Sequence, residues 1–209
     1  CVLPMYHCFA WTTSVSAPLY KGGTIVIQEN YTLAQTVELI NKYHIQEFFG
    51  VPTMIQMFLD GADPDRLRSV RFFISGGAPL PQRLSEEFLK KFGKPVQEGY
   101  GLSEASPVVA VNPTQRVKVG SIGQPLPSVV TQIRDENEQE LPPGVVGELC
   151  VQGLNVMAGY LNHPEATAEA LRGGWLHTGD LAYKDEEGYI FIVDRLKDMI
   201  ITAGENVYP

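Results

Sequence analysis

The sequence predicts an α/β fold in which a parallel, helix-covered sheet is followed by a small antiparallel β-barrel. From Gly23 to Glu98, short β-branched or aromatic runs alternate with segments of helical periodicity, a pattern typical of a parallel sheet between helices. After about Asn112, glycine and proline interrupt the chain every several residues, which is typical of short antiparallel strands. The ligand-binding edge of the first part should be the one where the carboxyl ends of its strands meet.

Strands of the first part are predicted from short β-branched and aromatic runs between turn residues. The opening letters CVLPMYH, residues 1–7, read as a buried strand already under way. The other candidate strands are 24–28, 46–49, 70–75 and 95–98.

Three helices are predicted between these strands. Thr32 is a typical N-cap for a helix that presents Leu33, Val37 and Ile40 on one face. Pro52 opens a second helix that ends at Gly61. The third has the strongest signals, because Pro81 opens it, apolar residues recur every fourth position and a glycine closes it. Those residues are Leu84, Phe88, Phe92 and Gly93.

The second part is predicted to contain strands at 129–133, 148–152 and 190–193. One short helix, 164–171, interrupts them, because Pro164 is suited to a first helical turn and Gly173 to an exit. The charged letters DRLKD then separate the strand at 190–193 from another strand-like run, MIIT. This change of composition predicts a domain boundary.

The predicted organisation therefore has three parts. Residues 1–112 form the α/β sheet subdomain, residues 113–193 form the β-barrel subdomain, and residues 194–209 form a connection into a further domain. The chain has no initiator methionine and stops directly after a glycine-containing turn. We therefore expect it to be a piece of a longer protein.

Composition excludes several classes of protein. With 209 residues, 44% of them hydrophobic, the chain is long enough to bury a sizeable core. Its apolar runs are much shorter than the roughly 20 residues of a membrane helix, so we expect a cytoplasmic protein without a transmembrane segment; peripheral membrane association stays open. A net charge of -8 argues against nucleic-acid binding. Three cysteines without a CxxC pair predict neither disulfides nor a zinc cluster.

Two glycine-containing motifs follow predicted strands. In SGGAPLP, the paired glycines let backbone approach a planar base or a carboxylate; the alternative is an ordinary strand-to-helix turn. In GYGLSE, Glu104 has the chemistry to hold Mg²⁺ and Ser103 to donate its hydroxyl to a phosphate. The alternative is a packed tyrosine, with Ser103 and Glu104 capping the next segment.

Two polar motifs lie in the second part. HTGD is predicted to end a strand, where Asp180 would accept hydrogen bonds from the adjacent hydroxyls of a ribose. Its alternative is an Asx turn, and His177 is interpreted as a surface residue of the barrel. DRLKD, by itself, reads as a solvated turn.

Taken together, these motifs resemble those of the adenylate-forming superfamily, which comprises acyl-CoA synthetases, peptide-synthetase adenylation domains and beetle luciferases. The resemblance is strongest to the fatty-acid CoA ligases, through the endings DRLKDMI and GENVYP. It extends over essentially the whole chain, through five motifs in the family's order. One difference is Ser103, where the family usually has threonine; the hydroxyl is retained.

The resemblance implies roles for individual residues. In the nucleotide site it places Asp180 and Arg195 on the ribose and Ile192 against adenine, and Lys197 falls at the hinge between domains. Gly76, Gly77 and Ala78 would line the acyl and adenine pocket. Near the start of the chain, PMYHCF matches a family segment in which His7 and Phe9 border the acyl pocket. Gly99, Tyr100 and Gly101 belong to the nucleotide-binding motif, with Ser103 and Glu104 on phosphate and metal.

The implied reaction has two steps and uses ATP, Mg²⁺ and coenzyme A. A carboxylic acid, expected to be a fatty acid, attacks ATP to give an acyl-adenylate, and coenzyme A then forms the thioester. The family's phosphate loop does not precede Cys1, and its adenylation lysine would lie beyond Pro209, so we expect the isolated chain to be inactive. The alternatives are a peptide-synthetase adenylation domain, a luciferase-like oxidoreductase and a non-catalytic nucleotide-binding module. Acyl chain length and oligomeric state stay open.

Overall fold

The computed structural model describes residues 1–196, 200–202 and 205–207, the last two segments through their backbone alone. The chain divides into two compact units. One comprises Cys1–Gly101 with Asn112–Gly120, and the other comprises Leu102–Val111 with the described residues from Ser121 onward. These units are not the residue ranges that the sequence suggested, because a ten-residue segment after Gly101 belongs to the second unit.

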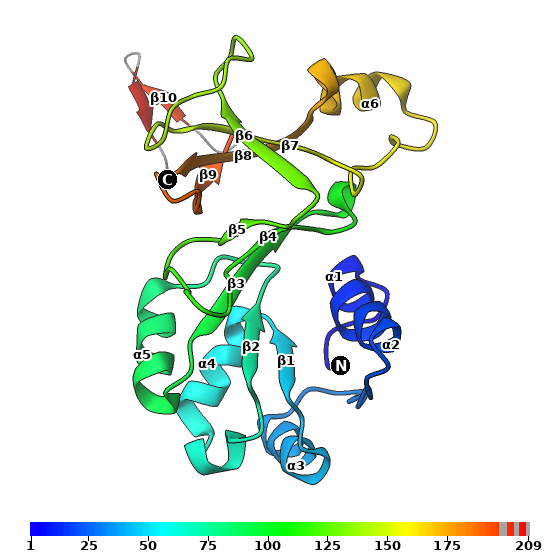
Figure 1. Ribbon diagram of the computed structural model, residues 1–209, viewed down its shortest axis with the longest axis vertical. Coiled ribbons are helices and arrows are strands. Elements are labelled where there is room, and N and C mark those ends of the chain that lie inside the picture. The colour runs from blue at the N-terminus through cyan, green and yellow to red at the C-terminus, as the bar shows by residue number, and fades with distance from the viewer. Residues whose placement is uncertain (197–199, 203–204, 208–209) are drawn as a thin grey trace. The chain divides into compact units, whose positions relative to one another are not determined.

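A parallel sheet forms the centre of the first unit. Its strands are β1 (Glu47–Gly50), β2 (Phe72–Ser75) and β3 (Val96–Gly101), in that spatial order. Figure 1 shows the three strands side by side, with helices α4 and α5 running along them. The strand-helix alternation predicted from the sequence is therefore confirmed.

Three helices cover the sheet where the sequence predicted them: α3 (Leu33–Tyr43), α4 (Pro52–Gly61) and α5 (Gln82–Phe92). The Thr32 side chain caps α3 by accepting a hydrogen bond from the Gln35 N–H. Gly93 ends α5 with φ of 66°, a left-handed conformation that glycine adopts without strain.

Aromatic side chains dominate the core of the first unit. Phe73 from β2 is fully buried, and its ring meets those of Phe48, Phe58 and Phe88 at centroid distances of 6.1, 5.7 and 5.0 Å. These rings come from β1, α4 and α5, so one cluster joins the sheet to two of its covering helices.

Two predicted strands are wrong. Residues 24–28 are not a strand: their backbone hydrogen bonds go to Cys1, whose amino group donates to the Val26 carbonyl and whose carbonyl accepts from the Gln28 N–H. One residue cannot supply a ladder of partners. Residues 1–7 are also not a strand, and only Leu3 among them is buried. A helical segment that was not predicted follows, made of α1 (Cys8–Ala10), a π-helical turn η1 (Trp11–Ser16) and α2 (Ala17–Tyr20).

The second unit contains a four-stranded antiparallel sheet. Its strands are β6 (Val129–Arg134), β7 (Gly147–Gly153), β8 (Leu176–Lys184) and β9 (Ile190–Arg195), in chain order. The antiparallel character predicted for this part is confirmed, and the described strands form an open four-stranded sheet where the sequence predicted a barrel. The shorter pairs are β4 (Val108–Val111) with β5 (Gln124–Pro125), and β10 (Ile200–Thr202) with β11 (Glu205–Val207).

Helical elements of the second unit are short. Helix α6 (Pro164–Ala170) agrees with the prediction, and it is followed by a 3-10 turn, η4 (Arg172–Gly174). Among the described residues, no helix combines the length and the apolar character needed to cross a bilayer.

Candidate functional site

The glycine loop of the first unit connects β2 to α5 and lies against an aromatic ring. Gly77 has φ of 79°, which favours glycine. A Cβ atom placed on Gly76 would lie 3.1 Å from Cζ of Phe9, so glycine allows this close approach. The structure therefore brings together Gly76 and Phe9, two residues assigned to one pocket from the sequence.

His7 has a local partner in the structure. It is exposed, and its Nδ1 atom accepts a hydrogen bond from the Phe9 N–H at 3.2 Å, which makes it the N-cap of α1. This contact fixes the start of the helix that carries Phe9. A contribution of His7 to substrate binding stays a prediction.

Glu98 was not identified as a site residue from the sequence, although its side chain contacts the same loop from β3. Its side chain extends from β3 and accepts a hydrogen bond from the Leu80 N–H at 3.0 Å, at the end of the glycine loop. Glu98 is only 9% exposed, and burial raises the pKa of its carboxyl group to about 7. The sequence did contain a signal for Glu98, because an ionisable residue within a strand predicted to be buried is unusual and indicates a specific partner.

The GYGLSE motif is divided between a strand and a turn. Gly99, Tyr100 and Gly101 are the last residues of β3, so the motif does not begin after the strand, as predicted, but inside it. Ser103 and Glu104 then open a 3-10 turn, η3 (Ser103–Ala105), in the second unit.

Glu104 is half-buried and is held by the segment that follows β7. Its Oε1 atom accepts a hydrogen bond from the Tyr160 hydroxyl at 2.8 Å, and its backbone carbonyl accepts from the Met157 N–H at 2.8 Å. Burial, and then the hydrogen bond to Glu104, raise the pKa of Tyr160. Tyr160 lies in none of the motifs singled out from the sequence, and its hydroxyl orients this carboxylate.

Asp180 and Arg195 are direct partners across β8 and β9. Nε of Arg195 lies 3.2 Å from Oδ1 of Asp180, and the two side chains are 74% and 10% exposed. A nearly buried carboxylate is thus paired with a guanidinium that remains open to solvent. Ile192, on the same strand as Arg195, is half-buried. The association of Asp180 with Arg195 agrees with the sequence; their binding of a ribose stays a prediction.

The HTGD motif lies inside β8 and does not end it, contrary to the prediction. The register shifts at this point, because His177 pairs with Cys150 and Leu181 pairs with Glu148. The three residues 178–180 therefore face the single residue Leu149 of β7. A bulge of this kind bends a strand and changes the direction of its side chains.

His177 is buried and does not lie on the surface as predicted. Its residue is 9% exposed, and its Nδ1 atom lies 2.8 Å from Oε2 of Glu148 and 3.4 Å from Sγ of Cys150. Arg172 also donates to Oε2 of Glu148, at 2.9 Å. Arg172 and His177 therefore both contact Glu148, which is the centre of this network.

Glu148, Cys150 and His177 offer atoms at a spacing suited to a metal ion. Their chemistry fits a hydrogen-bonded network better. Burial, and then the charge of Glu148, raise the pKa of the Cys150 thiol to about 12, so within this network the thiol is protonated. The Arg172 guanidinium already occupies the oxygen of Glu148 that a cation would need.

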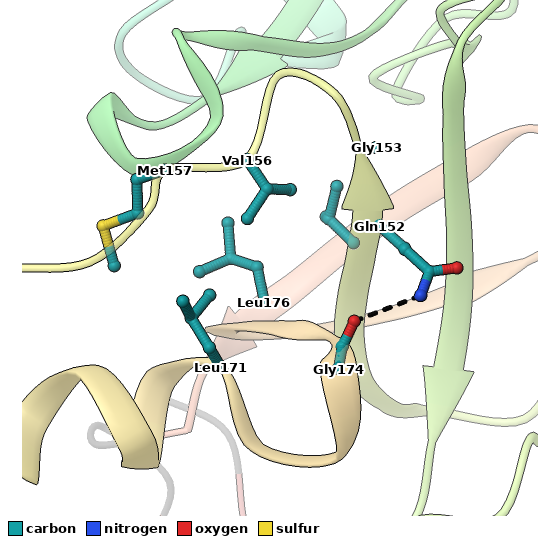
Figure 2. A pocket seen from close by; sticks show the side chains of 8 residues that line it. Gln152, Gly153, Val156, Met157, Leu171, Gly174 and Leu176 are labelled. Atoms are coloured by element: carbon teal, nitrogen blue, oxygen red, sulfur yellow. Dashed lines mark hydrogen bonds between the residues drawn. The ribbon is translucent and has the colours of Figure 1, made fainter.

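An apolar pocket of about 290 Å³ lies between β7, β8 and the end of α6. Figure 2 shows Val156, Leu171 and Leu176 turned toward one another, and Gln152 donating a hydrogen bond to the Gly174 carbonyl at its side. None of the residues predicted from the motifs lines this pocket.

Lys197, the predicted hinge, lies outside the described residues. The fold of the first unit defines a class of protein. A helix-covered parallel sheet whose strands end in glycine-containing loops is characteristic of α/β proteins that bind nucleotides. Within this class the chain belongs to the AMP-binding enzyme family, which matches residues 1–161.

The similar proteins are longer than this chain. A long-chain-fatty-acid–CoA ligase of Escherichia coli O6:H1 is 42% identical over 99% of the chain, which spans 38% of that protein. A feruloyl-CoA synthase of Amycolatopsis is 41% identical over 99% of the chain and 43% of its own length.

A solved structure shows the same fold with ligands. O-succinylbenzoate coenzyme A synthetase from Bacillus subtilis, in complex with ATP and a magnesium ion, matches with a TM-score of 0.90 and 33% identity. The match covers 99% of this chain and 43% of that structure's chain.

Proposed function

We propose that the chain is part of an ATP-dependent acyl-CoA synthetase that acts on a fatty acid. In the first step the carboxylate attacks the α-phosphorus of ATP, the bond to the β-phosphate breaks and pyrophosphate leaves. In the second step the thiol of coenzyme A attacks the acyl carbon and AMP leaves. The observation that carries the proposal is the Asp180–Arg195 pair in a chain of the AMP-binding enzyme family.

The nucleotide is proposed to contact residues of several motifs. Asp180 presents a charged acceptor that is suited to two neighbouring hydroxyl groups, and charge-assisted hydrogen bonds are about twice as strong as neutral ones. Arg195 holds this carboxylate and remains exposed on its other side. Ile192 supplies an apolar surface for adenine. The glycines of the loop after β2 let the backbone approach the base, together with Gly99, Tyr100 and Gly101.

Glu104 is the proposed ligand of Mg²⁺, with Ser103 on the α-phosphate. Carboxylate oxygens suit this hard cation, which takes one or two carboxylates and completes its coordination with phosphate and water. The donor set fits, because the half-buried Glu104 carboxylate is oriented by the Tyr160 hydroxyl. Magnesium would neutralise phosphate charge as it develops during the transfer.

The acyl group is proposed to lie at Phe9 and Gly76, with His7 at the border of the pocket. The fatty acid is favoured by the DRLKDMI and GENVYP endings, and one similar protein bears the name of a long-chain-fatty-acid–CoA ligase. An aryl acid is the alternative substrate, because a feruloyl-CoA synthase is almost equally similar.

Asp180→Ala in the full-length enzyme tests the nucleotide site. Loss of a charged acceptor should cost about 1.5 to 3 kcal/mol for each hydrogen bond, so we expect the dissociation constant of ATP, measured by calorimetry, to rise at least roughly tenfold. Glu186→Ala removes the same charge from an exposed position and is the control. An unchanged ATP affinity in Asp180→Ala would refute the ribose assignment.

Product analysis separates the proposed reaction from the alternatives. The full-length enzyme is incubated with ATP, coenzyme A and a panel of fatty and aryl acids, and the acyl-CoA and AMP formed are measured. We expect thioester and AMP with a fatty acid. Adenylate without thioester would favour a peptide-synthetase adenylation domain, light or oxidised product would favour a luciferase-like oxidoreductase, and nucleotide binding without AMP would favour a non-catalytic module.

A further inference from the structure

The bulge that carries Asp180 has a backbone conformation that needs support. Gly179 at its centre has φ of 72°, in the left-handed region. The Thr178 hydroxyl donates to the Leu149 carbonyl at 2.8 Å and accepts from the Asp180 N–H at 3.1 Å. These contacts hold both ends of the bulge, while the Gly179 N–H requires an acceptor of its own.

Glu148 supplies that acceptor. Its Oε1 atom accepts a hydrogen bond from the Gly179 N–H at 3.0 Å. Its Oε2 atom accepts a hydrogen bond from Arg172 at 2.9 Å and another from Nδ1 of His177 at 2.8 Å. The Nδ1 atom carries the proton in this contact, because a carboxylate only accepts. The side chain is 12% exposed. Arg172 and His177 therefore hold the Glu148 carboxylate through Oε2, and its Oε1 atom supports the bulge at Gly179.

From this geometry we infer that Glu148 is a positioning residue for the nucleotide site: it acts through the 178–180 bulge and sets the direction of the Asp180 carboxylate. The inference rests on the proposed binding of ribose by Asp180. It assigns to the Glu148 network a role in selecting nucleotides that carry both ribose hydroxyls, in addition to its contribution to stability.

Glu138 allows the two roles to be separated. It accepts from the same guanidinium, with Oε1 at 2.8 Å from Nε of Arg172, and its Oε2 atom lies 3.3 Å from Nε2 of His177. It thus shares the partners of Glu148, but the described contacts give it none with the bulge residues. A purely structural effect should follow loss of either glutamate, whereas a positioning effect should follow loss of Glu148 alone.

The experiment measures how the full-length enzyme discriminates between ATP, 2′-deoxy-ATP and 3′-deoxy-ATP. Dissociation constants are determined by calorimetry, and thermal stability is recorded for each variant. We expect the wild type to prefer ATP over either deoxy analogue by on the order of tenfold. Asp180→Ala should bind all three nucleotides about equally.

Glu148→Ala should lower the preference toward that of Asp180→Ala, and the double variant should lower it no further. Glu138→Ala should keep the wild-type preference. Glu148→Gln should lower it in part, because its amide has one acceptor oxygen where the carboxylate has two, and that oxygen cannot accept from Gly179 and from the Arg172 and His177 donors at the same time. Glu148→Asp keeps the charge but is one methylene shorter, so it should lose the preference and serves as the milder variant where Glu148→Ala does not fold.

Two outcomes overturn the inference in different ways. A wild-type preference in folded Glu148→Ala or Glu148→Asp, alongside its loss in Asp180→Ala, would make Glu148 a structural residue and leave the proposed function intact. Equal affinities of the wild type for all three nucleotides would remove the ribose assignment, and the inference would fall with it.

Discussion

Glu98 is a carboxyl group held inside the first unit by one backbone hydrogen bond. Burial disfavours its charged form, and the bond from the Leu80 N–H favours it less strongly, so the pKa rises to about 7. The same bond ties β3 to the end of the glycine loop. The protonation state of one residue is therefore linked to a loop that we propose to contact substrate.

Glu98 should make stability depend on pH between its unfolded pKa and its folded pKa. Because the folded pKa is the higher one, the stabilisation is complete below about 4.5 and is lost as the pH rises through about 7. From pH 5.5 to 8 its contribution should fall by about 2 kcal/mol. Urea denaturation of the wild type and of Glu98→Gln at several pH values measures this contribution as the difference between the two proteins. A difference that does not vary with pH would contradict the buried carboxyl group.

The sequence identified residues whose chemistry is visible in a short motif. Asp180 with Arg195, and Gly76 with Phe9, were each assigned to one site, and the structure places each pair in contact. Glu148 and Glu98 were missed, because their importance depends on which backbone N–H groups the folded chain brings to them. Motif letters do not record such contacts between distant segments.

At the level of elements, helices were predicted better than strands. The caps of α3 and α5 are set by residues beside the helix itself, Thr32 and Gly93. A strand also needs a neighbour, and residues 24–28 have the right composition but only Cys1 as a backbone partner. The bulge in β8 was missed for the same reason, since it is defined by the register with β7.

Phe73→Ala should strongly destabilise the first unit. The ring is fully buried and meets three other rings, so truncation leaves a cavity between β2 and the helices that cover it. A buried phenylalanine replaced by alanine typically costs 3 to 5 kcal/mol. The free energy of unfolding in urea measures the loss. Met57→Ala, on α4 and 42% exposed, is the control and should cost less than about 1 kcal/mol. Equal losses in the two variants would show that the aromatic cluster is not the core of this unit.

At the level of the whole molecule, the distribution of charge limits what the chain can bind. Its net charge is -8, and the proposed ligand ATP is also strongly anionic, so the chain as a whole repels this ligand. Binding of ATP must therefore depend on local groups. Among the residues with a proposed role in nucleotide binding, Arg195 is the single arginine, and it is proposed to contact the ribose. Neutralisation of the β- and γ-phosphates requires cations beyond Arg195 and one Mg²⁺.

The 209-residue chain alone should therefore not form an acyl-adenylate. It spans 38 to 43% of the length of the curated relatives named above. Catalysis of phosphoryl transfer consists largely of positioning and charge stabilisation, and a protein that lacks some of the neutralising groups loses most of the rate even where the ribose is held correctly. Pyrophosphate release is measured with ATP, Mg²⁺ and a fatty acid for the purified chain and for the full-length enzyme, after circular dichroism has shown that the chain is folded. We expect release from the full-length enzyme only. Comparable release by the chain would show that the residues described here are sufficient for the first step, and that the neutralising groups must be sought among them.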